Sequence, residues 1–249
     1  MKLRLAVCAL ALLAAACQPK AETAAPTPGP EANAKRMPLP DCAAVEAEDA
    51  TAGWTHKDCR LMSSDSVGLA FEARYSAPVE GQDQTITVQV VAPGDATLQT
   101  ITETMLNTFS APSLQDIDAD GRDELLIPLV TGNVNTTWAV WRATGTATQY
   151  KRLEELSGIS IDKTDDGYIV TSARSSASSW SVSYYKFDGE DLEPIANVDV
   201  SATGEDADGK VTGTTCVVTD AGGLDDVGLD PKAAEIKFCG DPAASGIFK

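Results

Sequence analysis

Residues 158–200 read GISIDKTDDGYIVTSARSSASSWSVSYYKFDGEDLEPIANVDV, and this stretch decides the fold class. Short runs that alternate apolar and polar residues are separated there by the pairs Asp166-Gly167 and Asp188-Gly189. Asp-Gly supplies the positive φ that tight hairpin turns need, and the alternation is typical of half-buried strands. The stretch therefore predicts an antiparallel meander.

Over the rest of the chain, short runs rich in β-branched and aromatic residues are likewise separated by turn residues. No second copy of the quoted stretch is found, so the sequence does not predict a regular repeat array. The segment 98–106 could form a helix, but its threonines favour a strand. We expect an all-β fold, an antiparallel meander in an incomplete, propeller-like arrangement, with a β-sandwich as the alternative. Over the whole domain, strands are expected at residues 68–75, 85–92, 124–130, 135–141, 167–173, 180–187, 192–200 and 211–219.

The N-terminus has the features of an export signal. Lys2 and Arg4 precede a short apolar run that ends at Cys17. This run is shorter than the ~20 residues that a membrane-spanning helix needs, so we expect residues 1–16 to be removed as a signal peptide. Residues 13–17, LAAAC, resemble the lipobox of bacterial lipoproteins, which implies a lipid on Cys17. A soluble periplasmic protein that is cut nearby is the alternative.

The segment that follows the signal is expected to be a tether. Residues 17–40 are rich in Pro, Ala and Thr and almost free of large apolar side chains. Such a segment cannot bury enough surface to fold, and we expect it to be disordered behind the lipidated cysteine. Gln18 stands where some inner-membrane lipoproteins carry Asp. We therefore expect a cell-envelope protein, lipid-anchored and facing the periplasm, at the outer membrane.

Four cysteines lie outside the expected signal peptide and lipidation site. In an oxidising compartment an even set predicts disulfides, and four cysteines allow three pairings. We expect the pairings that close short local loops, Cys42 with Cys59 and Cys216 with Cys239. A zinc site is disfavoured because the spacings are not CxxC and the chain has one histidine, His56.

The expected domain, residues 41–241 with a tail at 242–249, belongs to a strongly acidic chain. The formal net charge is −18 at pH 7. Nucleic acid is a disfavoured partner, because a binding protein needs positive charge to neutralise phosphates. The negative charge favours a basic protein partner through electrostatic steering, or it reflects a saline habitat.

One short motif has the chemistry of a metal site. Residues 116–125 read DIDADGRDEL, in which aspartates alternate, a glycine permits a sharp turn and an acid returns at the end. Calcium takes six to eight oxygen ligands at ~2.3–2.6 Å, and acids at alternate positions of a coiled loop can converge on one point. We expect a calcium loop at residues 116–124. Its expected ligands are Asp116, Asp118, Asp120, Glu124 and the backbone carbonyl of Arg122.

The loop is not an EF-hand, because Ile127 stands where an EF-hand loop needs its bidentate Glu. Its apolar continuation reads as a strand. A calcium loop that leads into a strand resembles the FG-GAP and integrin-type propeller blades, whose pattern DxDxDGxxE/D-L is matched at 116–125. If calcium binds, we expect it to have a structural role, in which it neutralises the loop and fixes the entry of the strand. An acidic hairpin without an ion is the alternative.

The features that follow the loop resemble a family of envelope lipoproteins. They include Gly132 and Asn135, then Trp138 and Trp141, then Tyr150, and a hairpin that leads into Tyr184, Tyr185 and Phe187-Asp188-Gly189. Some members are immunity proteins that inhibit lysozyme-like effectors delivered by bacterial-killing type IV secretion systems. The resemblance, over roughly residues 110–200, implies a loop that inserts into an enzyme cleft. The corresponding partner-binding residues are Ser175, Ser176, Ala177 and Trp180, and an ordinary exposed hairpin is the alternative.

Catalysis is disfavoured by the residues available. Nucleophilic catalysis by Ser or Cys usually requires a positioned base, and His56 is the single histidine. Trp138 and Trp141 fall on opposite faces of one expected strand, so they do not form a shared sugar platform. We expect a non-catalytic, calcium-binding envelope lipoprotein that binds protein, with a basic lysozyme-like hydrolase as the candidate target. The alternatives are a structural or sensory envelope protein and a carbohydrate-active enzyme.

Overall fold

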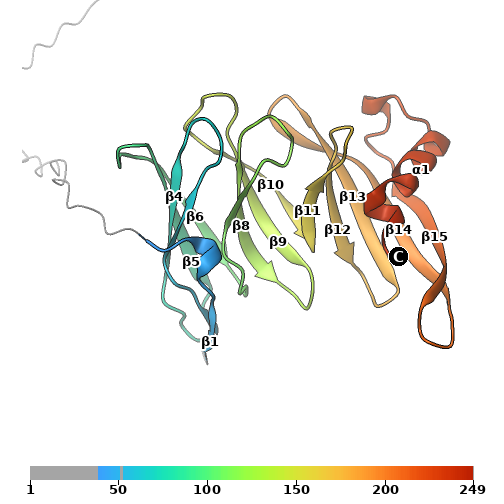
Figure 1. Cartoon of the computed structure of the whole chain (residues 1–249), viewed down its shortest axis with the longest axis horizontal. Helices are drawn as coiled ribbons and strands as arrows, with labels where there is room; N and C mark the ends of the chain where they lie inside the picture. Colours follow the sequence, from blue (N-terminus) through green and yellow to red (C-terminus); the bar gives the residue numbers. More distant parts are fainter. Residues whose placement is uncertain (1–38, 51–52, 249) are drawn as a thin grey trace, which may run out of the picture. The chain divides into compact units, whose positions relative to one another are not determined.

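Three antiparallel meanders follow one another along the chain (Figure 1). The computed structural model describes residues 39–50 and 53–248, so the expected signal peptide, the expected lipidation site Cys17 and the expected tether up to residue 38 lie outside the described residues. The first sheet contains β3 (Cys59–Met62), β4 (Ala70–Tyr75), β5 (Gln84–Val91) and β6 (Thr97–Met105). The second contains β7 (Ser113–Gln115), β8 (Glu124–Thr131), β9 (Thr136–Arg142) and β10 (Lys151–Gly158).

The third sheet has five strands, each paired with the next in sequence. They are β11 (Ser160–Lys163), β12 (Ile169–Arg174), β13 (Ser179–Asp188), β14 (Asp191–Glu205) and β15 (Val211–Asp220). A separate hairpin is formed by β1 (Glu48–Ala50) and β2 (Gly53–Thr55). The helical segments are η1 (Cys42–Ala44), η2 (Asp225–Val227), α1 (Pro231–Gly240) and α2 (Pro242–Ser245).

The predicted all-β, antiparallel meander is confirmed. Every strand expected from the sequence is present, and the Thr-rich segment forms β6 rather than a helix. The described residues contain three successive large sheets and no closed barrel, which differs from the two facing sheets of a sandwich. The chain therefore builds one meander after another, although the sequence shows no repeat.

The second sheet is buried on both faces because it lies between the other two. Leu125 and Ile127 of β8 pack in one core cluster with residues of the first sheet. Leu126 and Val140 point the other way and pack against the third sheet. A strand that is covered on both faces needs a continuous apolar run rather than alternation, and β8, ELLIPLVT, supplies one.

The outer face of the third sheet is covered by α1. The helix begins at Pro231 behind Asp230, whose side chain accepts a hydrogen bond from the Ala233 amide at 2.8 Å, a standard N-cap. Phe238 is buried against Tyr184, and the Tyr184 hydroxyl donates to the Phe238 carbonyl at 3.1 Å. Within the expected tail, 242–249, α2 forms and Ala244 is fully buried in the same cluster.

Both expected disulfides are present. Cys42 bonds to Cys59 beside the first sheet, and Cys216 of β15 bonds to Cys239 of α1. Each bond closes a short loop and so limits the freedom of the unfolded chain. Among the described residues, no helix has both the length and the apolar character needed to span a membrane.

Candidate metal centre

The loop between β7 and β8 brings the three predicted aspartates to one point. Carboxylate oxygens of Asp116, Asp118 and Asp120 lie within 4.8 Å of one another. Two oxygens that each lie ~2.3–2.6 Å from one calcium ion are at most ~5 Å apart, so the cluster has the size of a calcium shell. The backbone permits this by turning left-handed at Ala119 and Gly121, where φ is 62° and 84°.

Hydrogen bonds inside the loop hold the carboxylates in place. The Gly121 amide donates to Asp116 Oδ2 at 3.3 Å, and the Asp120 amide donates to Asp118 Oδ1 at 3.1 Å. The Arg122 amide donates to Asp120 Oδ1 at 2.8 Å. Each aspartate therefore uses one oxygen to fix the coil, which leaves its second oxygen for another partner.

Glu124 is the innermost acid of the site. It is fully buried, and its Oε2 accepts a hydrogen bond from the Ile117 amide at 2.9 Å. Burial raises the pKa of the Glu124 carboxyl to about 8; the Ile117 amide opposes this, and the charges of Asp118 and Asp120 add to it. Glu124 Oε1 and Asp116 Oδ1 are both buried and have no hydrogen-bond partner within the described chain.

These two oxygens fit a hard divalent cation. A buried oxygen without a partner is costly, and an all-oxygen set with several carboxylates is the donor set that calcium prefers. A bound cation would accept both lone pairs and stabilise the ionised form of Glu124. A calcium ion at this loop would be held by the Asp116, Asp118 and Asp120 cluster, and Glu124 Oε1 and Asp116 Oδ1 are the buried carboxylate oxygens there that have no hydrogen-bond partner among the described residues.

Arg142 is a site residue that the sequence did not single out. It lies at the end of β9, and its Nη2 is 2.6 Å from Asp118 Oδ2 and 3.4 Å from Asp120 Oδ2. Its Nε is 3.9 Å from Glu124 Oε1, and the guanidinium lies over the Phe187 ring at 3.8 Å from the centroid. Strand pairing brings Arg142 to the loop, because Leu125 pairs with Trp141 and the next residues, Glu124 and Arg142, lie at the same end of the two strands.

A second cation approaches from the third sheet. Lys163 of β11 donates to the backbone carbonyl of Asp116 at 3.0 Å, and its Nζ is 3.8 Å from Asp116 Oδ2. Four carboxyl groups thus meet two cationic side chains at the loop. The excess of acid over base is what a divalent ion would neutralise.

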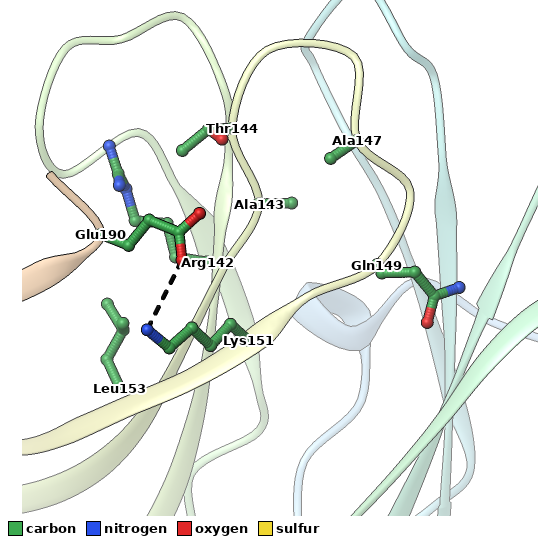
Figure 2. Close-up of a pocket in the computed structure, with 8 residues that line it drawn as sticks. All are labelled: Arg142, Ala143, Thr144, Ala147, Gln149, Lys151, Leu153 and Glu190. Carbon is green, nitrogen blue, oxygen red and sulfur yellow. Dashed lines mark ion pairs between the residues drawn. The ribbon is translucent and has the colours of Figure 1, made fainter.

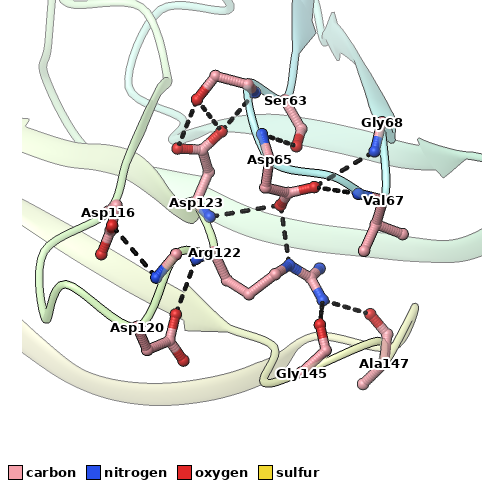
Figure 3. A network of polar contacts seen from close by, with 12 residues as sticks. Ser63, Asp65, Val67, Gly68, Asp116, Asp120, Arg122, Asp123, Gly145 and Ala147 are labelled. Carbon is pink, nitrogen blue, oxygen red and sulfur yellow. Dashed lines mark hydrogen bonds and ion pairs between the residues drawn. The ribbon is translucent and has the colours of Figure 1, made fainter.

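The Arg122 side chain points away from the loop toward the first sheet (Figure 3). Its Nε donates to Asp65 Oδ2 at 2.8 Å, and its Nη1 donates to the backbone carbonyls of Gly145 and Ala147. Burial raises the pKa of Asp65, but hydrogen bonds from the Ser63 hydroxyl, the Val67 amide and Arg122 outweigh it and lower the pKa to about 2. The side chain therefore anchors the loop, while its backbone carbonyl remains the predicted ligand.

Asp123 makes a second connection to the first sheet. Its Oδ2 accepts hydrogen bonds from the Ser64 amide at 2.6 Å and from the Ser64 hydroxyl at 3.0 Å. The amide of Asp123 donates to Asp65 at 3.4 Å (Figure 3). The segment that follows the aspartate cluster is thus tied to the loop between β3 and β4.

A small cavity lies beside Arg142 (Figure 2). Its volume is about 110 Å³, and its wall includes the Lys151 ammonium, which forms an ion pair with Glu190 at 3.6 Å. Both groups of this pair are exposed, so the pair adds little stability. The cavity is much smaller than the ~300–1,000 Å³ of a typical ligand pocket.

The predicted partner-binding residues lie at the other end of the strands from the aspartate loop. Ser175, Ser176 and Ala177 form an exposed turn between β12 and β13, closed by the amide of Ser175 donating to the Ser179 carbonyl at 2.9 Å. Trp180 is half-buried in β13. The structure therefore does not bring these residues into the candidate metal centre.

The turn is held by a neighbour from the second sheet. Asn135 Nδ2 donates to the Arg174 carbonyl at 3.0 Å, and the Arg174 amide donates to Asn135 Oδ1 at 2.9 Å. A groove of about 380 Å³ runs between the two hairpin tips, from Gly132 to Ser176. The tip is thus fixed at its base while its end faces solvent.

The other residues that were weighed for chemistry have structural surroundings. His56 Nε2 bonds to the Thr108 carbonyl at 2.9 Å, and its ring stacks on Tyr75 at 4.6 Å between centroids. Burial lowers the pKa of the His56 imidazole, although its bond to Thr108 opposes this. Trp138 and Trp141 pack in different core clusters, so they occupy opposite faces of β9 as expected.

The chain was compared with known protein families, curated proteins and solved structures. No family model, no curated protein and no solved structure matches the chain.

Proposed function

We propose that this chain is a calcium-stabilised, non-catalytic protein-binding module that a lipid on Cys17 holds at the bacterial envelope, facing the periplasm. The observation that supports the calcium part is the buried Asp116 Oδ1, which has no hydrogen-bond partner and belongs to a cluster of three aspartates of the right size, together with the buried, unpartnered Oε1 of Glu124 at the end of the same loop. The loop follows β7, leads into the doubly buried β8 and is tied to the first sheet through Arg122. A cation there would fix the central strand rather than perform a reaction.

Calcium binding is tested by calorimetry on the domain that begins at residue 39. The wild type is expected to bind one calcium ion with a Kd of about 10⁻⁴–10⁻³ M, the range of extracellular modules. Asp118→Ala removes one ligand and is expected to weaken binding by about tenfold or more, or 1.4 kcal/mol.

The matched control for this titration is Asp208→Ala. Asp208 belongs to the second acidic string, Glu205 to Lys210, which forms an exposed turn outside the metal-sized cluster. Its removal changes the net charge equally and is expected to leave the calcium titration unchanged. Equal binding heats from the wild type and Asp118→Ala would remove calcium from the proposal.

A basic lysozyme-like hydrolase is the proposed target. The net charge of −18 supports attraction to a basic enzyme, and the turn at Ser175–Ala177 offers an exposed tip. The purified domain is expected to slow the hydrolysis of peptidoglycan by a basic muramidase.

Two Ala→Lys variants localise that inhibition. Ala177→Lys places a positive charge at the proposed contact and is expected to weaken inhibition by about tenfold. Ala77→Lys makes the same change at the exposed loop between β4 and β5 and is expected to have little effect. A muramidase that is not slowed by the wild-type domain would refute the inhibitory role and leave the calcium site standing.

A further inference from the structure

The outermost strand of the third sheet has one free edge. β15 pairs with β14 on one side (Figure 1). On its other side, the backbone of residues 211–219 has no hydrogen-bond partner in the part of the chain that the structure describes. An edge of this kind presents unpaired N–H and C=O groups, which are a template for another strand.

The edge strands of the other sheets have features that hinder pairing with another chain, and β15 lacks these features. Proteins protect edges by making them short or by placing charges on them. β3, β7 and β11 have three or four residues each, and β10 carries charges at residues 151, 152, 154 and 155. The edge of β6 is engaged near both of its ends: Gln149 Nε2 donates to the Leu98 carbonyl at 2.8 Å, and the amide of Leu106, the residue after the strand, donates to the Leu129 carbonyl at 2.8 Å. β15 has ten residues, and none from Val211 to Thr219 is charged.

The free edge is regular where it is least polar, and a disulfide ties it to α1 there. The pairing with β14 runs without a register shift from Thr214 to Val218, a length typical of strands. In the middle of this stretch Cys216 is bonded to Cys239 of α1, and Val217 is 53% exposed. A partner strand would meet a preformed surface and would not have to order it.

The charges at the two ends of β15 decide what this edge fits. Glu205, Asp206 and Asp208 lie before the strand, with Lys210 as the only base among them. Asp220 ends the strand, Asp225 and Asp226 follow it, and all six acids are exposed. Antiparallel pairing of two copies through β15 would place the acidic start of one strand beside the acidic end of the other. Like charges in such positions are destabilising. A second copy is therefore a poor occupant, and a basic strand is a good one.

We propose that the free edge of β15 binds an extended, basic segment of another protein as an additional strand of the third sheet. Main-chain hydrogen bonds along 214–218 supply the pairing, and the acidic ends attract Lys and Arg side chains of the partner. This inference rests on the proposed protein-binding role and adds a second binding surface, separate from the Ser175–Ala177 turn and from the aspartate loop.

The probe is a short fluorescent peptide of alternating Lys and Val, measured by anisotropy with the domain that begins at residue 39. The unmodified peptide is expected to bind. The same peptide with N-methylated backbone amides keeps its charge but cannot donate hydrogen bonds, and it is expected to bind about tenfold more weakly or worse. Deuterium exchange of the amides in 214–218 is expected to slow when the unmodified peptide binds.

Two Lys substitutions at exposed apolar residues locate the site. Val217→Lys places a positive charge in the middle of the edge and is expected to weaken peptide binding by about tenfold. Ile236→Lys, at a residue of α1 that is 70% exposed, makes the same change of charge and is expected to stay within about twofold.

Three results would overturn the assignment of this edge. They are no binding of the unmodified peptide, equal binding of the methylated peptide, and a domain dimer that Val217→Lys dissolves. The last would identify a second copy as the occupant. The measurement uses neither calcium nor a muramidase, so failure here leaves the proposed function to its own tests.

Discussion

Replacing Arg122 by Met is expected to lower the free energy of unfolding by about 3–5 kcal/mol, because it leaves Asp65 as a buried, unpaired carboxylate. The side chains of Arg122 and Asp65 are 4% and 1% exposed, and the Arg122 Nε lies 2.8 Å from the Asp65 carboxylate. The substitution also strands the carbonyls of Gly145 and Ala147, which accept from the same guanidinium. Urea denaturation measures the loss.

A double-mutant cycle separates the ion pair from ordinary loss of packing. Asp65→Asn with Arg122→Met removes both charges, so the buried carboxylate is no longer unpaired. The double variant is expected to cost less than the sum of the two single variants by at least about 1 kcal/mol, the coupling typical of residues in contact. Strict additivity would show that the two side chains do not act as a pair.

The exposed pair of Lys57 and Glu48 provides the matched control. Its Nζ–Oε1 distance of 2.7 Å is as short as that of the buried pair, but its side chains are 56% and 66% exposed. Surface pairs of this kind are screened by water and salt, so Lys57→Met is expected to leave the denaturation midpoint unchanged. An equal loss at both sites would mean that burial does not decide the strength of these contacts.

The alternation of apolar and polar residues predicted the strands whose pairing is regular. It did not predict strands whose pairing is interrupted by a shift in register. In β10 the buried residues Leu153 and Leu156 are three positions apart, because the register with β9 shifts between Arg152 and Glu155. A shift of one residue moves a side chain to the other face, so this strand has no period of two. β3, β7 and β11 escaped prediction for another reason: three or four residues are too few to show a period.

The sequence contained a start signal for the helix α1, but the helix has too few apolar residues to show a helical pattern. Asp230 followed by Pro231 is the start signature of a helix, an N-cap with Pro at the first helical position. The apolar face is only Ala234 and Phe238, one turn apart, so no long stripe announced it. Tertiary packing on the third sheet gives this short helix its stability.

The acids of the site could be predicted from the sequence because they lie within one short loop. Asp116, Asp118 and Asp120 are brought together by local turns, and local turns follow from Asp and Gly spacing. Arg142 and Asp65 could not be predicted in the same way. Arg142 reaches the loop through strand pairing, and Asp65 reaches it across two sheets. Such contacts depend on how sheets pack, which one sequence does not show.

Arg142→Gln is expected to make the stability of the domain depend on calcium. In the structure the Arg142 guanidinium contacts Asp118 at 2.6 Å, with 9% of each side chain exposed, so it neutralises the loop. When a chelator removes calcium, the Arg142→Gln variant has crowded carboxylates without a neighbouring cation. Its free energy of unfolding is then expected to be lower than that of the wild type by about 3–5 kcal/mol. Calcium at about 10 mM with a Kd of about 10⁻⁴–10⁻³ M returns about 1.4–2.7 kcal/mol.

The wild type responds less to calcium for a physical reason. The ion needs oxygens of Asp118 that the guanidinium already holds, so part of its binding energy is used to displace Arg142. The rise in Tm on adding calcium is therefore expected to be larger for Arg142→Gln than for the wild type. Arg152→Gln is the control, because Arg152 is 36% exposed and pairs with Glu103 away from the loop. Its response to calcium should equal that of the wild type. If Arg142→Gln lost the same stability with and without calcium, the arginine would be the permanent cation of the loop, and the metal site would have to be abandoned.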